Sequence, residues 1–130
     1  MLEGIDLPDL LNTINKRIEK LLDKDHQIGH SYFMSVEKMD DLKNTFQNKI
    51  IPLLQEYFFG DYGKIGLVLG KEFVERDETK ENIFADFADG DAGEFAERTL
   101  YQLKDMAKVS NKDFIKAINC LLNKIEIVDE

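Results

Sequence analysis

DLPDLLNTINKRIEKLL, residues 6–22, sets the fold because its apolar residues recur at intervals of three and four. Leucines and isoleucines at this spacing lie along one side of an α-helix, which must then be buried against other elements. Asp6 can accept hydrogen bonds from the free amides of the first turn. Pro8 is tolerated there because its missing N–H would have no partner. The stretch therefore predicts a helix that begins just after Asp6.

A second helical pattern is carried by the apolar residues between positions 39 and 58. Ser35 precedes it and is expected to be its N-cap. Pro52 lies inside the pattern, where it removes one backbone donor and crowds the preceding turn. We therefore expect this helix to bend near residues 48–51 and to end at Gly60.

Two further helices are expected downstream. Asp61 is placed to cap a short helix over residues 62–69, which Gly70 would close. Ser110 opens a motif similar to a capping box, and apolar residues at helical spacing follow it as far as Ile125. Both segments are expected to bury one face.

Between these helices, residues 71–97 lose helical periodicity and are rich in charge, which indicates a long surface excursion with at most one short strand. Residues 99–103, TLYQL, have strand-like composition, and we expect them to pair with residues 83–87. The predicted fold class is mainly α, a small helical bundle with a short two-stranded antiparallel β ribbon. Residues 1–70 would form most of the bundle, and residues 71–130 would add the acidic excursion, the ribbon and a C-terminal helix packed on the same domain.

Composition narrows the range of functions. The chain has 130 residues, of which 43% are hydrophobic and 33% charged, the balance of one soluble globular domain. No apolar run approaches the roughly 20 residues that span a bilayer, so we expect a cytoplasmic protein without membrane contact. The net charge is −9, and residues 71–98 hold ten Asp/Glu against four Lys/Arg. Such a surface repels phosphate backbones and is a poor DNA-binding surface. Cys120, the single cysteine, is expected to be a small buried hydrophobe.

Three stretches resemble a known family in the same order along the chain. They are INKRIEKLL (14–22), DHQIGHSYF (25–33) and IIPLLQEYF (50–58), continued by Gly60-Asp61-Tyr62. Together they resemble the end of the AAA+ module in McrB-type proteins, the nucleotide-driven subunits of modification-dependent restriction systems such as those directed at 5-methylcytosine. IGHSYF is the most specific element, because a helix-bundle core would not choose this order of small, polar and aromatic residues.

The resemblance implies an AAA+ helical lid and a ring-forming parent that hydrolyses GTP or ATP with Mg²⁺. Implied partners are the lid's own N-terminal AAA+ core, neighbouring ring subunits, an endonuclease subunit and modified DNA. The sequence contains no Gly-x-x-x-x-Gly-Lys-Ser/Thr phosphate loop and no apolar strand ending in Asp-Glu for magnesium. We therefore expect the chain to be a C-terminal piece of the parent that has no catalytic residue and binds no cofactor alone.

Within the resemblance, Gly29, His30, Ser31 and Tyr32 stand roughly where related AAA+ proteins keep their second sensor motif, usually an arginine. This turn has no arginine, so His30 is the first candidate for a group that meets the nucleotide when the lid closes. The Gly29 backbone and the Ser31 hydroxyl would add donors. The alternative is that His30 and Tyr32 only satisfy nearby backbone and lock the lid.

Arg17 and Lys64 are secondary candidates for a subunit interface or a phosphate contact. Arg17 is expected on the face of its helix opposite the apolar stripe, and Lys64 near the N-terminal end of the helix over 62–69. A solvated surface role is the alternative for both. His26 could instead cap the C-terminal end of the first helix, where a cation is favoured.

No metal site is expected. The acidic run from Asp86 to Glu94 fails the ligand order of an EF-hand, and His26 and His30 lack a third ligand at zinc-binding spacing. A competing function is a free-standing acidic helical adaptor or inhibitor that docks where a lid would. The reading frame upstream of Met1 distinguishes the two, since only the lid hypothesis requires a nucleotidase core there.

Overall fold

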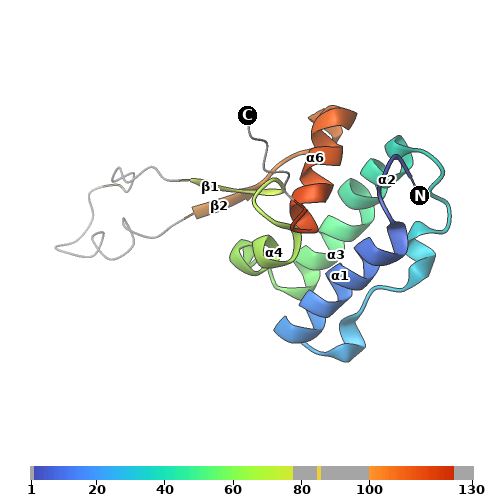
Figure 1. The fold of residues 1–130 in the computed structure, drawn as a ribbon. Helices are drawn as coiled ribbons and strands as arrows, with labels where there is room; N and C mark the ends of the chain where they lie inside the picture. Colours follow the sequence, from blue (N-terminus) through green and yellow to red (C-terminus); the bar gives the residue numbers. More distant parts are fainter. Residues whose placement is uncertain (1, 78–84, 86–99, 125–130) are drawn as a thin grey trace.

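The computed structural model describes residues 2–77, 85 and 100–124. It is mainly helical and carries a two-stranded antiparallel ribbon, so the predicted fold class is confirmed (Figure 1). In chain order the elements are α1 (Leu7–Leu21), η1 (Lys24–His26), η2 (His30–Phe33), α2 (Met39–Thr45), η3 (Phe46–Ile50), α3 (Ile51–Tyr57), α4 (Tyr62–Leu69), β1 (Val74–Asp77), β2 (Leu100–Leu103), η4 (Met106–Lys108) and α6 (Asn111–Leu121).

Helix α1 begins where the sequence predicts. The Asp6 side chain accepts a hydrogen bond from the Asp9 amide at 3.2 Å and so satisfies one free donor of the first turn. The stripe residues Leu10, Ile14 and Ile18 are fully buried. α1 packs against α4, which Figure 1 draws in blue and yellow-green respectively.

The start of α2 differs from the prediction that Ser35 is its N-cap. The N-cap is Lys38 and the helix begins at Met39, three residues later than a helix capped by Ser35 would begin. The Asp41 carboxylate accepts from the backbone amides of Glu37 and Lys38, each at 3.0 Å. An acidic side chain inside the first turn therefore fixes this helix start, and the serine is not used.

The irregularity expected around Pro52 is a π turn, η3, inserted between α2 and α3. The Ile51 amide reaches back five residues to the Phe46 carbonyl. The buried residues Phe46, Ile50, Leu54 and Phe58 are each four apart, a spacing that would drift by about 120° around an ideal α-helix of 3.6 residues per turn. The wider π turn absorbs most of this drift and keeps all four on the core side.

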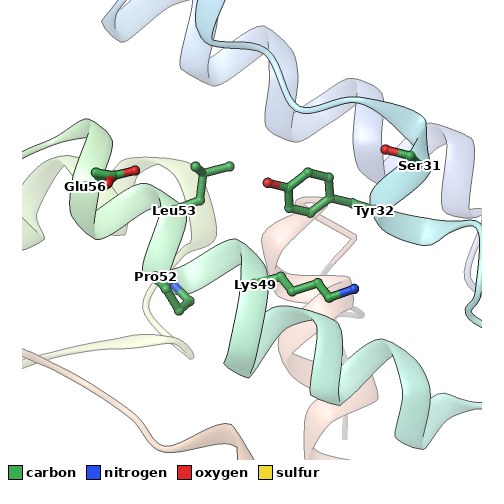
Figure 2. Close-up of a pocket in the computed structure, with 6 residues that line it drawn as sticks. All are labelled: Ser31, Tyr32, Lys49, Pro52, Leu53 and Glu56. Atoms are coloured by element: carbon green, nitrogen blue, oxygen red, sulfur yellow. The ribbon is translucent and has the colours of Figure 1, made fainter.

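The opposite side of the same segment is turned toward η2. Figure 2 shows Lys49, Pro52, Leu53 and Glu56 along η3 and α3, on the side that faces Tyr32. The π turn thus sets both the buried and the outward face of this helical segment.

The remaining caps follow the sequence. Asp61 accepts from the Lys64 amide at 3.3 Å at the start of α4, and Gly70 ends α4 with a φ of 95°, a value that favours glycine. The Ser110 hydroxyl accepts from the Asp113 amide at 3.1 Å at the start of α6. These predicted helix boundaries are confirmed.

The ribbon forms with a different partner from the one expected. β2 pairs antiparallel with β1, in a register that places Val74 opposite Leu103, so the strand lies at residues 74–77 of the excursion and the expectation of a partner at residues 83–87 was wrong. The reason is that Phe73 and Val74 are buried and fix the start of β1 against the bundle. The expected partner, residues 83–87, lies outside the described residues except for Ala85.

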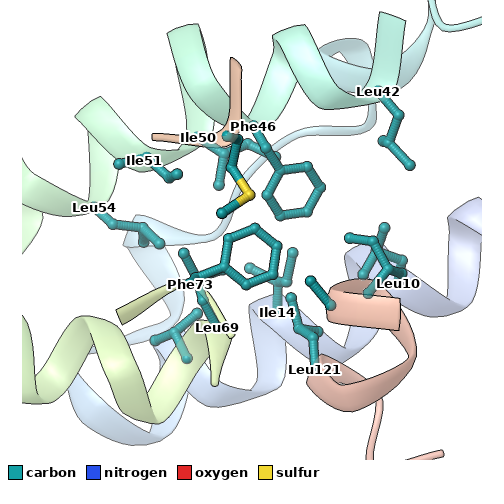
Figure 3. Packing of buried hydrophobic residues seen from close by; sticks show 14 of the residues in the cluster. Leu10, Ile14, Leu42, Phe46, Ile50, Ile51, Leu54, Leu69, Phe73 and Leu121 are labelled. Atoms are coloured by element: carbon teal, nitrogen blue, oxygen red, sulfur yellow. The ribbon is translucent and has the colours of Figure 1, made fainter. Parts of the chain in front are cut away.

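One hydrophobic core joins the two ends of the chain. Phe46 stacks on Phe73 with ring centroids 5.4 Å apart and meets the edge of Phe114 at 5.7 Å. Figure 3 shows Phe46 and Phe73 at the centre, with Leu10 and Leu121 nearby. Three polar contacts fasten the same regions together: the Gln47 side chain accepts from the Met106 amide, the Lys43 ammonium donates to the Val109 carbonyl, and the Asn111 side chain donates to Asp40.

Two smaller points complete the fold. Cys120 is partly buried, where the sequence suggested full burial, because it lies at the edge of the stripe formed by Ala117, Ile118 and Leu121. Of the described helices, none has the length and apolar character needed to cross a bilayer.

Candidate functional site

The turn that carries the sensor-like residues is held at both ends. Upstream, the Ile28 amide donates to Asn15 Oδ1 at 2.6 Å, and Asn15 Nδ2 donates to the Ile28 carbonyl at 2.9 Å. Downstream, the Phe33 side chain is buried and its ring stacks on Phe46 at 6.4 Å. The residues between these anchors form the short 3-10 helix η2. The turn is therefore fixed to α1 and to the core while its middle stays at the surface.

The four predicted residues are accessible, and they do not all face one way. Gly29, His30 and Ser31 are exposed, and Tyr32 is half-buried. Ser31 and Tyr32 line one surface hollow, whereas His30 lines another. These residues are adjacent in sequence, but the structure divides their side chains between two sides of η2.

The first hollow, here named the Lys49 pocket, lies between η2 and the η3–α3 segment. Its lining residues are Ser31, Tyr32, Lys49, Pro52, Leu53 and Glu56. In Figure 2 the Tyr32 ring points from η2 toward Leu53, the Lys49 side chain extends toward the Ser31 side, and Glu56 stands at the other end. The Ser31 hydroxyl and the Lys49 ammonium thus lie toward one end of the pocket, the Tyr32 hydroxyl points toward Leu53, and the Glu56 carboxylate lies at the other end.

Lys49 is the residue that sequence reasoning missed. It lies 17 positions after Tyr32 and outside the string that resembles the sensor region. The sequence does carry one sign of its placement: the apolar residues from Phe46 onward recur every four residues, and together with Pro52 this spacing indicates a π turn, which sets the face on which Lys49 lies. A helix without that turn would present a different face to η2.

The second hollow, here named the His30 groove, lies between η2 and the N-terminal half of α1. It is lined mostly by apolar groups, with the polar side chains of Asn12, Asn15 and His30 among them; the apolar members are Leu7, Pro8, Leu11, Phe33 and Met34. Met34 is 72% exposed, unusually high for a large apolar side chain next to a core. The groove offers His30 an open approach from solvent.

Neighbouring groups on the η1 side are engaged with each other. His26 Nδ1 lies 2.6 Å from Asp23 Oδ1, and the His26 ring meets the Tyr57 ring edge-on at 4.8 Å. The hydrogen bond to His26 holds the pKa of Asp23 below its usual value, and burial, followed by Tyr32 and Glu56, raises the pKa of Tyr57. The expectation that His26 caps the end of α1 was wrong, because its ring binds the Asp23 carboxylate instead.

Arg17 and Lys64 have different surroundings. Arg17 Nη1 donates to the Val68 carbonyl at 2.8 Å, and partial burial lowers the pKa of the guanidinium. The expectation that Arg17 lies opposite the buried face of α1 was wrong, since its side chain crosses to α4. Lys64 is exposed near the start of α4, where it was expected. Whether either residue contacts a nucleotide or a subunit is a prediction that these contacts do not test.

Within the described residues, no group of three or more His, Cys, Asp or Glu side chains is arranged to hold a metal ion. The acidic run from Asp86 to Glu94, rejected above as a calcium site, lies outside the described residues.

The fold and the held turn define a small helical domain that exposes a polar loop between its first two long helices and carries no phosphate loop of its own. Residues 6–66 match the family model described as McrB, alpha-helical lid domain. This part of the chain is a McrB-type helical lid region, extending from the N-cap of α1 to Gly66 in α4. A comparison with curated proteins found no match to the chain. The residues after the matched segment complete the same core through Phe73 and Phe114.

Proposed function

We propose that this chain is the lid of a McrB-type AAA+ nucleoside triphosphatase, which closes over GTP or ATP with Mg²⁺ bound by a separate core and contributes contacts between ring subunits. In this proposal the chain performs no catalysis alone. The endonuclease subunit and the modified DNA are partners of the complete cytoplasmic assembly.

The observation that carries the proposal is the pairing of rigid anchoring with exposure at residues 29–32. Asn15 and Phe33 fix the turn from both sides, while His30 and Ser31 remain open to solvent. Phosphoryl transfer is accelerated mainly by donors and cations held in place where negative charge develops. A polar turn fixed to a lid meets this need, because closing the lid brings its donors to the nucleotide without reordering the turn.

The proposal also accounts for the chemistry of His30. An imidazole next to a triphosphate donates a hydrogen bond through a ring N–H. The His30 groove leaves the ring accessible from the α1 side, so a core docked on that side can present its nucleotide to it. Gly29 contributes its backbone amide at the start of the same turn.

Two measurements test the proposal. The isolated chain should show no tight binding of GTP or ATP in isothermal titration, and a Kd below about 10 μM would overturn the lid assignment. In the nucleotidase that carries this lid, His30→Ala should lower nucleotide turnover by about tenfold to a hundredfold, the range for loss of one preorganised donor. His26→Ala is the matched control, since His26 is engaged with Asp23. Wild-type turnover of the His30 variant would remove the sensor role.

A further inference from the structure

Among the described residues, Phe59 is the most exposed large apolar side chain. It is 95% exposed in the turn between α3 and α4, and its φ of 51° lies in the left-handed region that favours glycine. The Gly60 amide donates to the Gln55 carbonyl at 3.0 Å and closes the end of α3, in an arrangement whose first left-handed position is usually glycine. A phenylalanine there strains the backbone without packing on the core, so its ring is available for a contact outside the chain.

The His30 groove has the size and the chemistry to receive a phenyl ring. Its volume is about 410 Å³, and a hollow of about 150 Å³ is enough to hold a benzene ring. Leu7, Leu11 and Met34 are among its apolar lining residues, and a methionine thioether packs well against an aromatic ring. Since Met34 is 72% exposed, its thioether is accessible to a ring that enters from solvent.

A chain cannot place its own Phe59 in its own groove. The groove is formed by the N-terminal half of α1, a helix of 15 residues that is about 22 Å long. Phe59 lies toward the opposite end, because Tyr57, near it in sequence, contacts the ring of His26 just after the C-terminal end of α1. In Figure 1 the N-terminal end of α1 and the connection between α3 and α4 correspondingly lie apart. A ring that fills this groove therefore comes from another molecule, and a second copy of the chain carries one.

Charge also favours this groove over the Lys49 pocket. Phe59 is flanked in sequence by two exposed acidic residues, Glu56 and Asp61. The lining of the His30 groove contains no acidic side chain, and His30 is its one group that can carry a positive charge. The Lys49 pocket contains Glu56 itself, whose carboxylate would repel the acids beside an incoming Phe59.

We propose that copies of this chain associate head to tail, with Phe59 of one copy seated in the His30 groove of the next. Such a contact joins two different surfaces, so a row of copies closes into a ring where the rotation between neighbours permits it. One side chain in one groove buries less than the roughly 1,200 Å² of a stable interface, so we expect a dissociation constant on the order of 0.1–1 mM for the free chain.

The association has a consequence for His30. A seated Phe59 covers the open side of the groove, so head-to-tail association and the proposed nucleotide contact of His30 exclude each other. The contact between copies itself does not depend on the proposed lid function, and its failure would leave the lid assignment intact.

The test is sedimentation equilibrium of the full 130-residue chain up to about 1 mM, with two variants that each remove one half of the contact. Phe59→Asp removes the ring, and Met34→Glu places a carboxylate in the groove. The average mass of the wild type should rise with concentration, and each variant alone should associate at least about tenfold more weakly. Mixed in equal amounts, the two variants should form a 1:1 dimer and nothing larger, because one supplies the intact groove and the other the intact Phe59.

Leu67→Asp, at a side chain 66% exposed on α4, is the control and should associate like the wild type. Phe59→Gly should stay monomeric while being at least as stable in urea as the wild type, which excludes unfolding as the cause. The proposal is overturned by a wild-type chain that stays monomeric at about 1 mM, by equal loss of association in the Leu67 variant, or by a mixture of the Phe59→Asp and Met34→Glu variants that stays monomeric. Undiminished association of Met34→Glu alone also overturns it, since the groove would then not be the receiving surface.

Discussion

Asn15 holds Ile28 through both ends of its side-chain amide, accepting from the Ile28 N–H at 2.6 Å and donating to the Ile28 carbonyl at 2.9 Å. This pair of hydrogen bonds imitates the pairing between two strands and fastens the loop to α1 one residue before the sensor-like turn. Through this contact, α1 fixes the position of Gly29 and His30.

Replacing Asn15 should loosen the turn. Asn15→Ala removes two partly buried hydrogen bonds and should lower the free energy of unfolding by about 2 kcal/mol, at about 1 kcal/mol per bond. Urea denaturation measures this loss. Hydrogen exchange should also accelerate at residues 28–32 more than in α6. Asn12→Ala, one turn earlier and exposed, is the control and should change stability by less than about 0.5 kcal/mol.

We expect Arg17 to stabilise the folded chain. Its guanidinium donates to the Val68 carbonyl near the end of α4, so Arg17→Met should lower the free energy of unfolding by about 1 kcal/mol. Thermal denaturation with Lys16→Met as the exposed control measures the difference. If Arg17→Met leaves stability unchanged, the contact with Val68 does not support the fold, and a role at a subunit interface becomes the better explanation.

Phe73 lies outside the segment that matches the lid family, yet it should be essential to that segment. Its ring packs on Phe46 and Phe114, so Phe73→Ala should cost about 3–5 kcal/mol. The loss should appear in one cooperative transition that includes α1 and α2. Leu100→Ala, at a side chain 53% exposed on β2, should be nearly neutral. Unchanged stability of α1 in the Phe73 variant would mean that the two parts fold separately.

The start of α2 should depend on pH through Asp41. Hydrogen bonds from the Glu37 and Lys38 amides hold the pKa of Asp41 below its usual value. A lowered folded-state pKa means that the stabilisation is present at neutral pH and is lost as the pH falls through that lowered value. The difference in urea midpoint between wild type and Asp41→Asn should therefore be largest near pH 7 and shrink below about pH 4, the ordinary range for Asp. Asp25→Asn, an exposed carboxylate, controls for the loss of one charge; an equal pH profile in both variants contradicts the assignment.

Local sequence signals predicted correctly those helices in which the capping residue and the apolar stripe indicate the same start. Asp6, Asp61 and Ser110 each cap the helix expected from them, because the partner amide lies three residues away in the chain. The prediction from Ser35 was wrong because an acidic residue six positions later, Asp41, accepts the hydrogen bonds of the Glu37 and Lys38 amides and so determines where the helix starts.

Features that depend on contacts between distant parts of the chain could not be predicted from these local signals. The partner of β2 depends on Phe73 and Val74 packing against the bundle, and a four-residue strand has too little alternation to identify its partner. The accessibility of the sensor-like turn could be predicted from its polar residues. The division of Ser31 and His30 between two hollows, and the approach of Lys49, required the π turn and the fold around it.

The central claim is that residues 29–32 meet the nucleotide once the lid is joined to its core. Hydrogen exchange of these amides, in the nucleotidase proposed to carry this lid and with and without a non-hydrolysable GTP or ATP analogue, tests it most directly. Nucleotide should slow exchange at residues 29–32 and leave the exchange of α6 unchanged. Equal exchange rates at residues 29–32 in both states, with nucleotide bound to the core, would contradict the claim.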